Sequence, residues 1–170
     1  MPYNPEIHHR RSIRLHDYDY TTEGFYFVTI CSHGHIPLFG TIVNGIMHKN
    51  SVGQVVEDEY CQLAKRYPQI VCYEHVVMPN HFHAIIGISD TVGAGSAYPK
   101  DETPTIRHYT LGQIIGDFKY KTTKRVNMCT PLWQRNYYEH IIRNQHSHDE
   151  IVAYILENPL HWHDDRLYVP

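Results

Sequence analysis

Short runs of apolar and β-branched side chains, separated by polar turns, predict the strands of this chain. These runs lie at residues 25–31, 70–77, 81–88 and the end of 132–143, with a shorter hairpin at 39–47. The first run is apolar on both faces, which is typical of a central strand. Asn44-Gly45 suits the turn of the hairpin. Pro79, between the second and third runs, indicates a tight turn or a bulge there.

Apolar positions three and four residues apart predict the helices. These helices run over 51–66, 111–126 and 147–158. Ser51 and Thr110 are suitable N-caps for the first two, and Ser147 with Glu150 forms a capping-box pattern at the start of the third. The order of strands and helices predicts an α+β fold, in which helices cover one face of an antiparallel sheet. The histidine-bearing face then remains free for another element or a ligand.

Residues 1–170 are predicted to form a single domain, because the length, the apolar fraction of 42% and the charged fraction of 19% are those of a globular chain. Residues 1–24 form a predicted N-terminal arm with basic residues in its middle. This arm could grip phosphate or could simply be a solvated segment. Residues 89–108 are rich in small and polar side chains and predict a mobile loop.

The overall composition restricts the class of protein. A formal net charge of −3 does not favour general binding to nucleic acid, so any basic surface must be local. The four cysteines are widely spaced, which argues against a structural zinc ribbon and agrees with reduced thiols in the cytoplasm. No signal-peptide pattern and no apolar run near the ~20 residues of a membrane span is present, so no membrane partner is expected.

Two histidines stand out in the apolar run at 81–88. Side chains alternate along a strand, so His81 and His83 share one face, with Cβ atoms roughly 6–7 Å apart. Phe82 and Ala84 lie on the other face and are suited to packing. Two imidazoles at this separation can bind one metal ion, but they leave a divalent ion short of ligands.

The last predicted helix offers residues that could complete such a site. Tyr154 and Asn158 are four residues apart and therefore lie on one helical face. An asparagine oxygen is a suitable ligand for Mg²⁺ or Mn²⁺, and a tyrosine hydroxyl beside the metal could attack a phosphodiester. Composition alone does not select Tyr154 among fourteen tyrosines, and by itself it favours an ordinary half-buried helix residue.

Four ordered segments carry a resemblance to a known family. The sequence Met-Pro-Asn-His-Phe-His at 78–83 resembles the histidine–hydrophobe–histidine (HUH) motif of the single-tyrosine transposases. Three further segments resemble the REP-associated tyrosine transposases of that superfamily, and they lie at 10–20, 133–144 and 154–159. Together they span nearly the whole chain in the expected order.

This resemblance implies a ferredoxin-like or RRM-like sheet and a C-terminal helix that carries a nucleophilic tyrosine. It implies that His81 and His83 bind Mg²⁺ or Mn²⁺ from a central strand, with Asn158 at the third ligand position. It implies that Tyr154 cleaves and transfers single-stranded DNA near hairpins such as repetitive extragenic palindromes, through a 5′-phosphotyrosine. DNA transposition is the corresponding function.

Positive charge, and not the family motif, selects the first candidate DNA contacts. Two groups come from the arm and from the end of the second helix, and two further arginines come from the 133–144 segment: Arg10, Arg11, Arg14, Lys119, Lys121, Lys124, Arg125, Arg135 and Arg143. The aromatic side chains of 132–143 could be core residues or a platform for unstacked bases.

Several alternatives stay open at this point. The chain could be a hairpin-binding protein that does not cut DNA, or a histidine–metal hydrolase of small substrates in which the tyrosine is incidental. The sequence does not distinguish a monomer from a homodimer. The chain also ends soon after the tyrosine helix, whereas some members of the family carry a longer tail.

Overall fold

A computed structural model describes residues 23–89 and 109–170 of the chain. Nearly all of the predicted arm at 1–24, with its three arginines, lies outside the described residues. So does nearly all of the predicted loop at 89–108.

A four-stranded antiparallel sheet forms the centre of the fold, with strand order β4-β5-β1-β6. The strands are β1 (Gly24–Cys31), β4 (Ile70–Val77), β5 (His81–Ile88) and β6 (Tyr138–Ile142). A separate hairpin consists of β2 (Gly40–Val43) and β3 (Ile46–Lys49). Its turn residues, Asn44 and Gly45, have φ angles of 51° and 75°, as the Asn-Gly sequence predicted.

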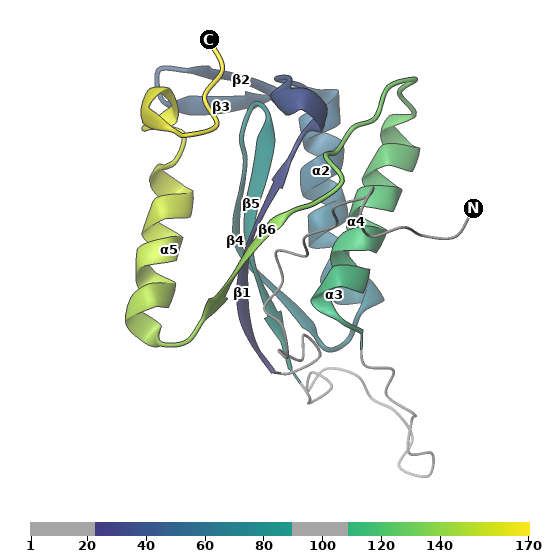
Figure 1. Ribbon diagram of the computed structural model, residues 1–170, viewed down its shortest axis with the longest axis vertical. Coiled ribbons are helices and arrows are strands. Elements are labelled where there is room, and N and C mark those ends of the chain that lie inside the picture. The colour runs from purple at the N-terminus through teal and green to yellow at the C-terminus, as the bar shows by residue number, and fades with distance from the viewer. Residues whose placement is uncertain (1–22, 90–108) are drawn as a thin grey trace, which may run out of the picture.

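Helices lie on both faces of the sheet (Figure 1). They are α2 (Ser51–Cys61), α3 (Leu63–Arg66), α4 (Leu111–Val126) and α5 (Gln145–Glu157), with short 3₁₀ turns at His33–His35 and Trp162–Asp164. α2 and α4 cover one face and α5 lies against the other. The order β1-α2-β4-β5-α4-β6 is the ferredoxin-like arrangement, so the predicted α+β fold with a C-terminal tyrosine helix is confirmed.

The alternation of side chains along the strands separates two cores. The larger core packs one face of β1 and β5 against the first three helices; its strand members include Tyr26, Val28, Ile30, Phe82, Ala84 and Ile86. The smaller core lies between the other face and α5, and its members are Phe27, Ile85, Ile142 and Ile155. α5 is therefore held on the histidine-bearing face by Ile155, which is fully buried.

The capping residue of α2 and the start of α5 differ from the prediction. Asn50, and not Ser51, caps α2, because its Oδ1 accepts from the backbone N–H groups of Val52 and Gly53. Similarly, α5 begins earlier than expected, because Asn144 Oδ1 accepts from the N–H of Ser147. In both cases an asparagine just upstream satisfies the free N–H groups of the first turn.

The remaining local predictions are largely correct. Thr110 caps α4 with the capping box completed by Gln113. Pro79 and Asn80 form the tight turn between β4 and β5, closed by the Met78 N–H that donates to the His81 carbonyl at 2.8 Å. The irregularity of pairing lies in β4, between residues 72 and 75. None of the described helices combines the length and apolar character needed to cross a bilayer.

Two helical glycines provide a test of the packing of α2. A Cβ atom at Gly53 would lie 2.1 Å from the carbonyl oxygen of Phe39, whereas a Cβ at Gly116 in α4 would meet nothing within 4 Å. Replacement of a helical glycine by alanine normally stabilises by about 1 kcal/mol. We therefore expect Gly116→Ala to stabilise the protein and Gly53→Ala to destabilise it by about 1–3 kcal/mol, in chemical denaturation. Equal stabilisation by both would contradict the close approach of α2 to Phe39.

Candidate active site

β5 places two buried imidazoles side by side on the face that α5 covers. His81 and His83 are 0% and 2% exposed, and their ring centroids are 4.5 Å apart. They share this face because they are two residues apart in one strand. The strand therefore brings four imidazole nitrogens into a small, water-poor region.

Hydrogen bonding fixes the tautomer of His81. The Nδ2 group of Asn80 donates to the carbonyl oxygens of His35 at 3.1 Å and Leu167 at 2.7 Å. The Oδ1 atom of Asn80 then faces His81 Nδ1 at 2.8 Å and must accept its proton. His81 Nε2 consequently carries a lone pair. It is buried and has no hydrogen-bond partner among the described residues.

His83 is oriented in a similar way. Its Nδ1 lies 2.8 Å from Thr29 Oγ1, on the neighbouring strand β1. Phe27 stacks on the imidazole with ring centroids 5.2 Å apart. The opposite nitrogen, Nε2, lies 3.3 Å from the hydroxyl oxygen of Tyr154. The tyrosine of α5 and the histidine of β5 are thus direct neighbours.

Both imidazoles are neutral at physiological pH. Burial lowers the pKa of His81 to about 4, although the charge of Asp165 opposes this shift. Burial also lowers the pKa of His83 well below its ordinary value, and the neighbouring His81 acts in the same direction. The contact of 3.8 Å between His81 Nε2 and Asp165 Oδ2 is therefore not an ion pair at pH 7. Neutral imidazoles are the form that binds metal.

Asp165 brings a carboxylate into the same region. Its side chain is 5% exposed, and its oxygen and the His81 and His83 nitrogens all lie within 4.8 Å of one another. The backbone N–H of Leu167 donates to Asp165 Oδ1 at 2.6 Å, and Asn158 Nδ2 donates to Oδ2 at 3.2 Å. This orientation leaves the Asn158 Oδ1 atom buried and without a partner in the described part of the chain.

This donor set fits a divalent metal. Two imidazole nitrogens and a carboxylate oxygen are a common combination for transition metals, and an amide oxygen is a further possible ligand. Two buried atoms, His81 Nε2 and Asn158 Oδ1, lack a hydrogen bond to any described residue, and a metal ion would satisfy both. The His81–His83–Asp165 cluster could therefore hold a metal ion.

α5 presents Tyr154 to this cluster, with Asn158 one turn later. Tyr154 is half-exposed, and the pKa of its hydroxyl is raised by burial and then by the charge of Asp165. Contact with Asn158 and the positive charge of Arg166 act in the opposite direction. At neutral pH the phenol is therefore protonated, and additional positive charge is needed to activate it.

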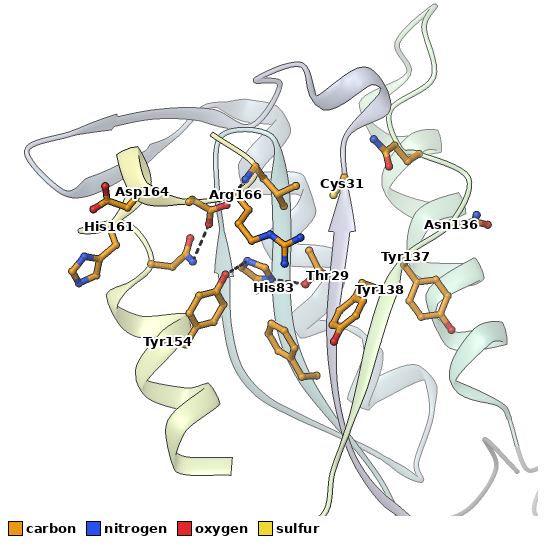
Figure 2. A pocket seen from close by; sticks show the side chains of 15 residues that line it. Thr29, Cys31, His83, Asn136, Tyr137, Tyr138, Tyr154, His161, Asp164 and Arg166 are labelled. Atoms are coloured by element: carbon orange, nitrogen blue, oxygen red, sulfur yellow. Dashed lines mark hydrogen bonds between the residues drawn. The ribbon is translucent and has the colours of Figure 1, made fainter. Parts of the chain in front are cut away.

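A pocket of about 660 Å³ opens in front of Tyr154 and His83. Figure 2 shows the hydroxyl of Tyr154 directed at His83, with the side chain of Arg166 reaching into the same space. Its walls come from β1, from the segment before β6, from α5 and from the C-terminal segment; they include Thr29, Cys31, Gln134, Tyr138, His161 and Asp164. Arg166 lines the pocket and forms no ion pair with any described residue.

The cations predicted on α4 do not act as one group. Lys119 Nζ is partly buried and donates to the backbone carbonyls of Gln134, Arg135 and Asn136. Arg125 donates to carboxylates of α2. Lys119 thus stabilises the backbone of residues 134–136, which the charge pattern did not predict. The side chains of Lys121, Lys124, Arg135 and Arg143 are exposed, and their contact with DNA stays a prediction.

Sequence reasoning did not select Asp165 or Arg166. Trp162 gave a signal, because a large indole ring needs apolar surroundings in which to pack. In the structure Trp162 is buried, with its ring 5.9 Å from that of His81 and 5.2 Å from that of Tyr168. This packing returns the segment after α5 to the histidine strand.

Comparison with known proteins gives a relative in sequence and solved structures of similar fold. The chain is 42% identical over 175 residues to an uncharacterised protein of Haemophilus influenzae, covering 98% of this chain and 97% of that protein. This chain belongs to the same family as the Haemophilus protein. No family model matches the chain.

The solved structure of a REP-associated tyrosine transposase bound to a REP hairpin is similar in fold. Its TM-score is 0.59 at 18% sequence identity, and the match covers 93% of this chain and 89% of that one. The family that the sequence motifs resemble is therefore also the family whose fold this chain has.

The first prediction for this site concerns metal binding. We expect Asp165→Asn to weaken Mn²⁺ binding by at least about tenfold, because the carboxylate faces both imidazoles. Asp164→Asn, which changes the adjacent exposed carboxylate, should leave the affinity almost unchanged. Free Mn²⁺ measured by electron paramagnetic resonance gives both affinities. Unchanged affinity in Asp165→Asn, together with loss in Asn158→Ala, would assign the oxygen ligand to Asn158 instead.

The second prediction concerns stability without metal. The unfolded chain binds protons at His81 near pH 6.5, but the folded chain binds them only near pH 4. The contribution of His81 to the free energy of unfolding, about 3 kcal/mol, is therefore complete above pH 6.5. It is lost as the pH drops from 6.5 toward 4. The free energy of unfolding, measured by denaturation in EDTA at several pH values, should fall less with decreasing pH in His81→Gln. His146→Gln, an exposed histidine on α5, should keep the original fall; equal slopes in all three proteins would contradict this account.

Proposed function

We propose that this protein is a metal-dependent endonuclease and strand-transferase of single-stranded DNA, with Tyr154 as its nucleophile and DNA transposition as its function. The observation that carries this proposal is the distance of 3.3 Å between the Tyr154 hydroxyl and Nε2 of the buried His83, at a pocket open to solvent. A phenol next to metal-ligating nitrogens is suited to attack on a phosphodiester.

The residues around Tyr154 suggest which groups would hold the metal ion and the phosphate. His81 Nε2, His83 Nε2 and an oxygen of Asp165 or Asn158 would hold Mg²⁺ or Mn²⁺. When bound, the metal would stabilise negative charge on the phosphate and on the phenol oxygen. Arg166 supplies a positive charge to the same pocket and lowers the pKa of Tyr154.

The chemical step is a transfer of phosphorus to the tyrosine. A bond forms from Tyr154 Oη to phosphorus as the bond from phosphorus to the 3′ oxygen of the preceding nucleotide breaks. The phenol gives its proton to solvent and the leaving oxygen takes one up. The products are a 5′-phosphotyrosine and a free 3′-hydroxyl. Attack by another 3′-hydroxyl reverses the step and joins a new strand.

The structural relative supports the choice of DNA and of hairpins. That transposase is bound to a REP hairpin, and the described chain shares its fold over nearly the whole length. We infer a similar substrate here, a single strand next to a hairpin. The exposed cations Lys121, Lys124, Arg135 and Arg143 are candidates for contacts to the hairpin backbone.

We also infer that one chain supplies the whole site. Tyr154 lies beside His83 of its own chain, and α5 is held there by the buried Ile155. No second copy is needed to bring the nucleophile to the imidazoles. This supports a monomer that uses Tyr154 in cis.

The direct test is a covalent adduct. We expect the protein, with Mg²⁺ or Mn²⁺, to form an adduct with a labelled single-stranded hairpin oligonucleotide from beside its gene, seen on a denaturing gel. Tyr154→Phe should abolish the adduct, because no other hydroxyl of residues 23–89 and 109–170 forms a hydrogen bond with His83 Nε2. Tyr120→Phe, an equivalent change on α4, should retain it.

The outcomes separate the alternatives. An adduct formed by Tyr154→Phe would disprove the nucleophile, and binding without any adduct would favour a hairpin-binding protein that does not cut. A mixture of Tyr154→Phe and His83→Ala chains tests the use of Tyr154 in cis. Recovery of adduct formation in the mixture would show that two chains share a site.

A further inference from the structure

A row of side chains crosses the sheet from the proposed metal site to the edge strand. His83 on β5 pairs with Thr29 on β1, and Thr29 pairs with Tyr138 on β6. Directly paired residues lie on one face, so all three side chains project to the side of the pocket. Neighbouring strands are about 4.8 Å apart, which puts Tyr138 roughly 10 Å from His83 along the row.

Tyr138 has the properties of a ligand contact more than those of a core residue. Its side chain lines the pocket and is 56% exposed. Figure 2 shows its ring on the same side of β6 as Thr29 and Tyr154, whereas Tyr137 lies on the opposite side of the strand. Tyr137 also lines the pocket but packs against the larger core. Of the two adjacent tyrosines, Tyr138 is therefore the exposed ring that a ligand can stack on.

Hydrogen bonds fix the backbone of residues 134–136, which precede Tyr138 along the chain. The Gln134 N–H donates to the Cys31 carbonyl at 3.0 Å, and Lys119 Nζ donates to the carbonyls of residues 134, 135 and 136. Trp133 Nε1 donates to Thr122 Oγ1 at 2.7 Å beneath this segment. The Gln134 side chain lines the pocket, and its amide forms no hydrogen bond within the described residues. Its backbone is fixed, and its amide is a donor and acceptor at the pocket wall.

A nucleobase matches this combination of groups. An exposed aromatic ring stacks on the flat face of any unpaired base, and an amide can bond to the edge of a base. The pocket also holds Arg166, which suits the phosphate of the same nucleotide. Tyr154, His83 and Tyr138 line one pocket, so a phosphate beside Tyr154 and a base on Tyr138 would occupy the same space.

We infer that Tyr138 and Gln134 form a nucleobase subsite, which holds an unpaired base adjacent to the phosphate that Tyr154 attacks. This inference rests on the proposed function and extends it to recognition of the cleavage site. Tyr138 supplies stacking, and Gln134 supplies discrimination between bases. Lys119 is a positioning residue, because it acts through the backbone of 134–136.

The test uses hairpin oligonucleotides in which 2-aminopurine replaces one unpaired base at a time. The protein carries Tyr154→Phe so that the DNA stays intact. One position should show quenched fluorescence on binding, because the base stacks on Tyr138. Adding Tyr138→Ala should abolish that quench and weaken binding about tenfold, whereas Tyr138→Trp should keep the quench. Tyr120→Ala, which removes a ring of equal exposure (57%) on α4, should leave the quench unchanged.

Base preference gives a second readout with Tyr154 intact. Adduct formation should differ about tenfold or more between the best and worst base at the quenched position. Gln134→Ala should reduce this difference, and Lys119→Met should reduce it without a change in Mn²⁺ affinity.

The inference fails if Tyr138→Ala keeps both the quench and the affinity, or if no unpaired position is quenched in bound DNA. In either case adduct formation by the chain with Tyr154 intact would show that the proposed function still holds. Absence of both DNA binding and adduct would overturn the proposed function together with the subsite.

Discussion

The site depends on keeping two neutral imidazoles buried in one orientation. Burial of an imidazole is costly unless its N–H group is satisfied, and here Asn80 and Thr29 each meet one Nδ1 atom. The Nε2 atoms then face a common space. Because Asn80 also binds the carbonyls of His35 and Leu167, the tautomer of His81 depends on the backbone at both ends of the described chain.

The same bonds couple the C-terminal segment to the histidine strand. Leu167 is bound through its carbonyl to Asn80 and through its N–H to Asp165. Burial of Trp162 beside His81 strengthens this return of the chain. Asp165 and Arg166 are therefore placed at the pocket by the very contacts that orient His81. The site is assembled from three segments far apart in sequence, and loosening of one should disturb the others.

The net charge of the chain does not show where its basic residues act. The pKa of Lys119 is lowered by burial, and its ammonium group binds three carbonyls beside the pocket. It thereby shapes a wall, whereas Arg166 contributes charge to the pocket itself. A basic residue beside a pocket need not contact a ligand, because a partly buried one can instead fix the backbone of the pocket wall.

The amino-acid sequence by itself determined the α+β class and the shared face of His81 and His83, because both follow from periodicity; the ferredoxin-like arrangement was implied by the family resemblance. The alternation of β5 and the spacing of Tyr154 and Asn158 are local properties, and the motifs gave their order along the chain. Local patterns also misassigned the capping residue of α2 and the start of α5, because Asn50 and Asn144 accept from the first free N–H groups. Only the tertiary structure decided that Asp165 and Arg166 reach the pocket, that Lys119 faces a backbone and that Tyr138 and Tyr137 point to opposite sides. These outcomes depend on packing between distant segments, which no periodic pattern encodes.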